Sequence, residues 1–106
     1  MRGEIWTVAG SGYASKPRPA LVIQDDKFSA TGSIVILLLT TTDIGTAVHR
    51  IRIPANANTG LLTESFAQVD KIAAIKRESL GQRIGFAPQS VMAAVNKALT
   101  VFLGIK

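Results

Sequence analysis

The chain has 106 residues, of which 47% are apolar, so we expect one compact domain over residues 1–106. Its 12 Lys and Arg outnumber its 7 Asp and Glu, which favours a polyanionic partner but also fits plain solubility. Cysteine is absent, which excludes disulfides and thiolate metal sites, and the longest apolar run, Ile34–Leu39, is too short to cross a bilayer. We therefore expect a cytoplasmic protein without a membrane partner.

The N-terminal part predicts two strands, at Arg2–Val8 and after Pro19, joined by a small loop at Ala9–Ser15. The second strand is preceded by Lys16-Pro17-Arg18-Pro19. Each proline fixes its own φ and favours an extended conformation in the residue before it, so the backbone that carries the Arg18 side chain is conformationally restricted. A planar guanidinium matches phosphate oxygens, although an ordinary edge strand also accepts such a segment.

The middle of the chain predicts two more strands. Ile34–Leu39 is a continuous apolar run, rich in β-branched residues, which is typical of a central strand buried on both faces. Val48–Ile53 alternates apolar and polar residues and stops at Pro54, so we expect one buried and one solvated face. Arg50 and Arg52 would share the solvated face.

The remaining segments predict a loop at Ala55–Gly60, one or two short strands within Phe66–Ile75, and another strand at Arg83–Phe86. Many short strands at close spacing favour a small barrel or sandwich. A closing helix is predicted from Pro88, where a first helical residue tolerates a missing N–H, to Gly104. Its apolar residues recur at helical spacing and should pack on the barrel: Val91, Val95, Ala98, Leu99 and Phe102.

The ordered set of segments resembles the MazF/PemK family of bacterial toxins. The resembling segments, which cover nearly the whole chain, are Arg2-Gly3-Glu4-Ile5-Trp6, Arg18 to Asp26, Ser33 to Thr41, Gly60 to Ile72 and Leu80 to Gly104. The resemblance implies a mainly β fold, a small SH3-like barrel of the CcdB/PemK type with a C-terminal α-helix. It also implies an endoribonuclease toxin that acts as a homodimer, cleaves single-stranded mRNA, and is inhibited by a cognate antitoxin, with which it would contact DNA.

Among other chemistries, a transition-metal site is not predicted, because the one histidine, His49, lacks partners at ligand spacing. Asp25-Asp26 suggests either a magnesium nuclease or, more simply, the cap of a turn. Gly10-Ser11-Gly12 lacks the lysine and the helix of a phosphate-binding loop. We therefore expect no metal and no cofactor, and arginine and hydroxyl groups remain as the reactive set.

Such groups suffice for RNA cleavage, because the RNA supplies its own nucleophile, the 2′-hydroxyl, and the protein aligns it and stabilises negative charge on the phosphate. Arg18 fits the charge-stabilising role. Thr40 resembles the family's catalytic threonine at the end of the third strand, and Thr41 is the alternative if the strand register is shifted by one.

Further candidate RNA-binding residues are predicted from charge, hydroxyl or amide groups, and aromatic stacking: Lys16, Tyr13, Thr41, Arg50, Arg52 and Gln68. For Gln68 three interpretations stay open: a base, an antitoxin contact or merely a strand residue. Two positions depart from the family pattern: Ala67 replaces an acidic residue, and Asp70 replaces the arginine of the family motif. Both departures weaken any proposal of a catalytic carboxylate there.

Two other functions stay open at this point. A CcdB-like toxin that poisons gyrase would share the barrel, but it would lack the pair formed by Arg18 and Thr40. A non-catalytic nucleic-acid-binding barrel would need only the basic charge balance.

Overall fold

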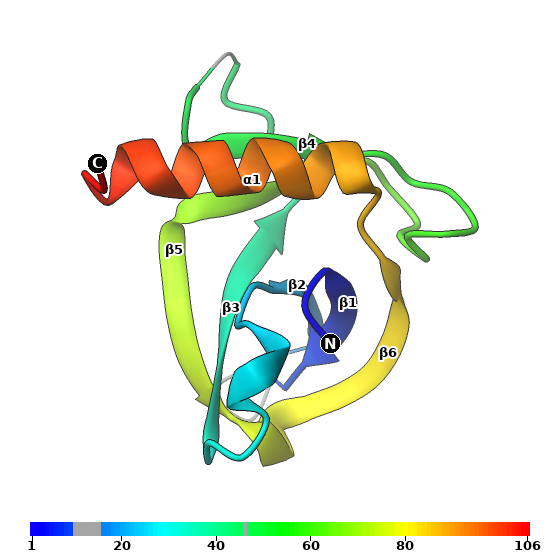
Figure 1. Cartoon of the computed structure of the whole chain (residues 1–106). Coiled ribbons are helices and arrows are strands. Elements are labelled where there is room, and N and C mark those ends of the chain that lie inside the picture. The colour runs from blue at the N-terminus through cyan, green and yellow to red at the C-terminus, as the bar shows by residue number, and fades with distance from the viewer. Residues whose placement is uncertain (10–15, 46) are drawn as a thin grey trace.

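The computed structural model describes residues 1–9, 16–45 and 47–106. Its strands are β1 (Glu4–Val8), β2 (Arg18–Val22), β3 (Ser33–Thr40), β4 (Arg50–Ile53), β5 (Ser65–Lys76) and β6 (Leu80–Phe86). The helix α1 (Gln89–Phe102) follows them, and two short 3-10 turns, η1 (Asp26–Phe28) and η2 (Arg77–Ser79), lie between strands. Figure 1 shows the strands curving around the interior of the molecule, with α1 lying across one end.

The six strands form one antiparallel sheet in the order β4-β5-β3-β2-β1-β6. This confirms the predicted fold class of a mainly β protein with a C-terminal helix. Within the described residues β4 and β6, the two ends of the sheet, do not pair with each other. The sheet is therefore coiled like a barrel but stays open.

The long strand β5 corrects the prediction of one or two short strands, because it runs without a break over Ser65–Lys76. Its pairing with β3 shifts along the way: Leu39 lies opposite Ala67, but Leu37 lies opposite Ile72. At this shift β5 bends, so that its first half pairs with β4 and the end of β3, and its second half with the start of β3 (Figure 1). Each half alone has the length of an ordinary strand.

The central strand β3 is buried on both faces, as predicted. Leu37 and Leu39 belong to one hydrophobic core, and Ile34 and Ile36 belong to a second core on the opposite face. Trp6 packs against the second core while only partly buried, and its indole Nε1 donates to Glu4 Oε1 at 2.9 Å.

The helix α1 covers the first core with Val91, Val95 and Ala98, and Leu99 packs against it while partly buried. Two details correct the prediction. Pro88 precedes the helix in an extended conformation instead of forming its first residue, because the ring only fixes φ. Phe102 is 48% exposed, since the helix projects beyond the core there, and its ring contacts that of His49. Gly104 follows the helix end with φ +68°, as expected.

The loop between β4 and β5 packs against β6 and is hydrogen-bonded to the end of that strand. Thr59 is fully buried, and its hydroxyl donates to the Pro54 carbonyl at 2.7 Å. The Phe86 N–H donates to the Asn58 carbonyl at 2.9 Å. Gly60 has φ +71°, and a Cβ at this position would overlap the Ile84 carbonyl. These contacts hold the β4–β5 loop against β6.

No helix in the described part of the chain is both long and apolar enough to span a membrane.

Candidate active site

Arg18 and Thr40 lie on neighbouring strands at one end of the sheet. β2 begins at Arg18 and β3 ends at Thr40, and the two antiparallel strands place Ala20 opposite Leu38. Continuing this register by two residues brings Arg18 opposite Thr40. Residues that face each other in this way project from the same face of the sheet, about 5 Å apart. The two predicted catalytic residues are thus neighbours in the fold, and their catalytic role stays a prediction.

The two side chains differ in their surroundings. Arg18 is exposed, whereas Thr40 is half-buried. The Oγ1 atom of Thr40 accepts a hydrogen bond from the Thr42 N–H at 3.2 Å, which fixes the start of the following loop. Because this bond uses the oxygen as an acceptor, the hydroxyl hydrogen of Thr40 can still be donated to a ligand.

The row of facing residues continues across two more strands. Thr40 lies opposite Phe66 on β5, and Phe66 lies opposite Arg52 on β4. The side chain of Arg52 is 67% exposed, and its Nε lies 3.6 Å from Glu64 Oε1. An exposed pair of this kind contributes little, so Arg52 can exchange it for a polyanion. The row therefore carries an exposed guanidinium at each end, with a hydroxyl next to Arg18.

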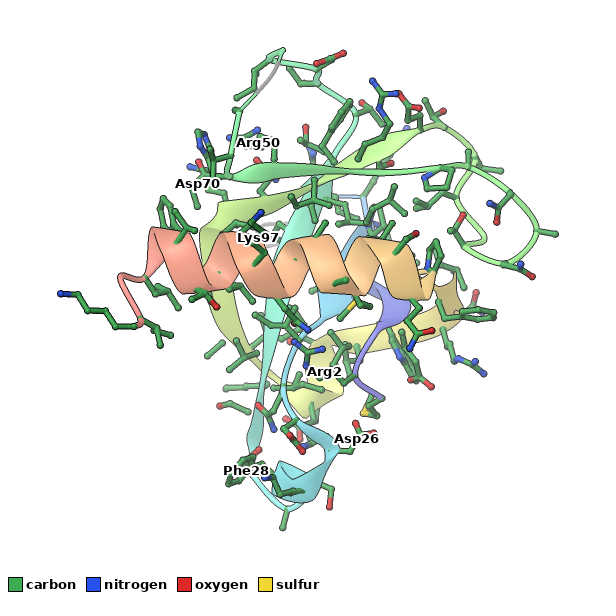
Figure 2. All side chains as sticks on the ribbon, turned by 45° about the horizontal axis from the view of Figure 1, so that its top comes forward. Arg2, Asp26, Phe28, Arg50, Asp70 and Lys97 are labelled. Atoms are coloured by element: carbon green, nitrogen blue, oxygen red, sulfur yellow. The ribbon has the colours of Figure 1, made fainter. Side chains whose placement is uncertain are left out.

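Arg50 behaves differently from Arg52, which corrects the prediction that both lie on a solvated face. Its Nε and Nη2 each lie 3.1 Å from a carboxylate oxygen of Asp70, and its side chain is only 13% exposed. Figure 2 shows this pair beyond α1, near the C-terminal end of the helix. The hydrogen bonds from Arg50 lower the pKa of Asp70, so the carboxylate stays charged and neutralises the arginine. The Asp70 departure from the family pattern thus removes Arg50 as an accessible cation.

A hollow of about 300 Å³ lies beside the row, and we call it the basic hollow. It is lined by Asp43, Gly45, Ala47, Arg50, Arg52 and Phe66. The two arginines lie on one face of β4, as their alternation predicted, and both line this hollow, but only Arg52 exposes most of its side chain.

The other predicted RNA-binding residues have varied positions. Lys16 is exposed two residues before Arg18. Gln68 donates from Nε2 to the Leu38 carbonyl at 3.2 Å, where the pairing of β3 and β5 shifts, so its side chain has a structural bond. Tyr13 lies outside the described residues.

Asp25 and Asp26 lie in a turn, in agreement with the simpler of their two interpretations. Asp25 accepts a hydrogen bond from the Lys27 N–H at 2.9 Å, at the start of η1. Asp26 accepts from the Arg2 N–H at 2.8 Å and lies 3.2 Å from the N-terminal amine of Met1. These bonds lower the pKa of Asp26. Figure 2 shows Arg2 and Asp26 on the other side of α1 from Arg50.

A second cavity, of about 320 Å³, was not predicted from the sequence, and we call it the edge pocket. Its lining includes Pro19, Thr41, Leu61, Leu62, Thr63 and Ile84. Thr41, the alternative to Thr40, therefore lines a different cavity from the basic hollow. The sequence carried no local signal for Phe66, Glu64 or this pocket, because strand pairing alone brings these residues to the row formed by Arg18 and Thr40.

Comparison with known proteins identifies related chains. A family model described as PemK-like, MazF-like toxin of type II toxin-antitoxin system matches residues 1–103. A probable endoribonuclease MazF of Mycolicibacterium smegmatis is 45% identical over 105 residues, which cover 98% of this chain and 96% of the relative. Endoribonuclease MazF9 of Mycobacterium tuberculosis is 32% identical over 113 residues, with coverage of 98% and 96%.

Solved structures agree with the fold. An endoribonuclease in complex with its cognate antitoxin, from a mycobacterial species, superposes with a TM-score of 0.81 at 25% identity, covering 100% of this chain and 96% of that chain. The Mycobacterium tuberculosis toxin MazF-mt6 superposes equally well, with a TM-score of 0.81 at 21% identity and coverage of 97% and 98%.

Proposed function

This chain belongs to the PemK-like, MazF-like family of toxins of type II toxin–antitoxin systems, and from this premise we propose that it cleaves single-stranded RNA at a short sequence without a metal ion. The endoribonuclease activity agrees with the names of its curated relatives. The structural observation that supports the proposal is the position of Arg18 opposite Thr40 at one end of the sheet.

In the proposed reaction the 2′-oxygen of the RNA attacks the neighbouring phosphorus and its proton leaves. The bond from phosphorus to the 5′-oxygen breaks, and that oxygen takes up a proton. The products are a 2′,3′-cyclic phosphate and a 5′-hydroxyl. Negative charge accumulates on the non-bridging oxygens, where the planar Arg18 guanidinium can donate two hydrogen bonds and Thr40 a third.

Substrate binding in this proposal uses exposed cations on both sides of the reacting phosphate. Lys16 lies close to Arg18 in the chain, and Arg52 ends the row of facing residues on the other side. Unpaired bases of single-stranded RNA are accessible for recognition, which permits cleavage at a short sequence. The gyrase-poisoning alternative has no support from the curated relatives, which are named as endoribonucleases.

We also propose two protein partners. A cognate antitoxin is expected because a related endoribonuclease has been solved with one, and the net charge of +5 favours an acidic partner. A second copy of the chain is expected from the family resemblance. The proposed place of action is the cytoplasm, where mRNA is translated.

The test of the function is cleavage of a mixed-sequence RNA by the purified protein in excess EDTA, with mapping of the cut ends. We expect cleavage to continue, with a 5′-hydroxyl on one product and a cyclic or 3′-phosphate on the other. The same RNA with 2′-deoxyribose at the cut position should stay intact. Cleavage of the deoxy substrate, or inactivation by EDTA, would contradict the mechanism.

A further inference from the structure

The edge pocket and the basic hollow lie on the two faces of the sheet, at the end where β3 stops and β5 begins. Thr40 and Phe66 face each other on the side of the basic hollow. Their chain neighbours Thr41 and Ser65 line the edge pocket. Because successive strand residues project from opposite faces, the ends of β3 and β5 lie between the two cavities in the described part of the chain.

The edge pocket is also continuous with the proposed phosphate site along the chain. Pro19 and Thr41, which line it, directly follow Arg18 and Thr40. Consecutive Cα atoms are about 3.8 Å apart. A ligand that crosses the edge can therefore contact Arg18 and Thr40 with one group and fill the edge pocket with the next.

One wall of the edge pocket is preformed. Gly60 and Ile84 contribute to this wall, and their backbones approach so closely that a Cβ on Gly60 would overlap the Ile84 carbonyl. The buried hydroxyl of Thr59 donates to the Pro54 carbonyl and accepts from the Asn56 N–H, which fixes the preceding turn. A preformed pocket binds a ligand with a smaller ordering cost than a mobile one.

The lining suits a flat ligand with apolar faces and polar edges. Pro19, Leu61 and Ile84 supply aliphatic surface, and the exposed residues Thr41 and Thr63 supply hydroxyl groups. Leu62 also lines the pocket, although its side chain is 100% exposed, so an apolar group stands at the mouth. Nucleobases combine apolar faces with hydrogen-bonding edges, and they are accessible in single-stranded RNA.

We propose that the edge pocket receives the base of the nucleotide next to the scissile phosphate and selects the sequence at that position. This inference rests on the proposed function, because it takes the phosphate to lie at Arg18 and Thr40. An apolar side chain of a protein partner is the competing occupant. The base is favoured because two exposed threonines contribute to the lining and because the pocket begins one residue beyond the phosphate site.

The test combines changes in the protein with changes in the RNA. The preferred site is first mapped with wild-type protein on a randomised RNA pool. Each nucleotide flanking the cut is then replaced in turn by an abasic nucleotide. We expect one adjoining position at which the abasic change lowers kcat/KM by about 10-fold or more. In Leu62→Ala and Thr63→Val this loss should shrink to a few-fold at that position only.

Val101→Ala is the matched control, because Val101 is also an exposed apolar residue, at 60% exposure, but lies on α1. It should keep the full abasic loss. Equal abasic losses in wild type, Leu62→Ala and Thr63→Val would overturn the proposal. Weaker antitoxin binding by these two variants, with an unchanged base preference, would also overturn it, because that result would identify the pocket as a binding site for a peptide. Absence of RNA cleavage by the wild-type protein would instead contradict the proposed function itself.

Discussion

Asp70 holds Arg50 through two hydrogen bonds of 3.1 Å, although twenty residues separate them in the chain. Arg52, two residues after Arg50, has only a looser contact of 3.6 Å with Glu64 and is 67% exposed. Two arginines that look equivalent in the sequence thus have different roles. Arg50 is part of the folded structure, and Arg52 is available to a charged ligand.

Arg52→Ala should weaken binding of RNA and leave the fold intact. A contact between one cation and one phosphate of a single strand contributes about 0.7 to the slope of log affinity against log salt concentration. We expect the slope to fall by about this amount in Arg52→Ala. Binding of an uncleavable 2′-deoxy substrate at several salt concentrations measures it. Arg50→Ala is the comparison variant, and this change should lower thermal stability more than Arg52→Ala does. An unchanged salt slope in Arg52→Ala would exclude Arg52 from the RNA-binding surface.

The pH dependence of stability should reveal the ion pair of Arg50 and Asp70. The pKa of Asp70 is lowered in the folded protein below the usual 3.8. The pair therefore stabilises the fold above that value, and this contribution is lost as the pH falls through the lowered pKa. Asp70→Asn should be less stable than wild type at neutral pH, by about 1 kcal/mol. The two proteins should converge in acid, as measured by denaturant unfolding; a constant difference at every pH would contradict the role of the charge.

Features that depend on neighbouring residues in the chain were predictable. The both-face burial of β3 follows from its uninterrupted apolar run, and the helix stripe of Val91, Val95 and Ala98 follows from its spacing. Features that depend on strand pairing were not. A single shift of register bends β5 into two halves, and nothing within Phe66–Ile75 reveals it.

The candidate site divides in the same way. The proline-flanked Arg18 and the end of the apolar strand at Thr40 are local features, so both positions were predicted. Their juxtaposition depends on the β2–β3 register. The loss of Arg50 as a free cation depends on Asp70, which β5 brings alongside β4. The edge pocket combines residues from five separate segments, so no pattern within one segment indicates it.

Gly60→Ala should destabilise the protein strongly. The residue has φ +71°, and the added methyl group would overlap the Ile84 backbone carbonyl, which cannot move without shifting β6. We expect a loss of about 2 kcal/mol or more in the free energy of unfolding. Gly32→Ala is the control, because its added Cβ would meet no atom within 4 Å. Similar unfolding midpoints for the two variants would show that the wall of the edge pocket is less rigid than its geometry indicates.

Arg18→Ala should lower the cleavage rate about 100-fold or more, which is the effect of removing one donor that stabilises transition-state charge. The fold should not change, because the side chain is exposed. Arg18→Lys should restore little activity, since an ammonium group lacks the two parallel donors of guanidinium. Single-turnover kinetics with saturating protein separates this effect from weaker binding. Wild-type rates in Arg18→Ala would refute the catalytic assignment.

Thr40→Val and Thr41→Val together test which threonine acts at the phosphate. Thr40 shares a face with Arg18, so loss of its hydroxyl should slow cleavage at every site by about 100-fold. The same change also removes the acceptor for the Thr42 N–H, and Thr40→Ser, which keeps the hydroxyl, should therefore retain most of the activity. Thr41 lines the edge pocket, so Thr41→Val should alter the preferred base while the rate at the best site changes little. The reverse pattern, with the larger rate loss in Thr41→Val, would place the scissile phosphate on the other face of the sheet.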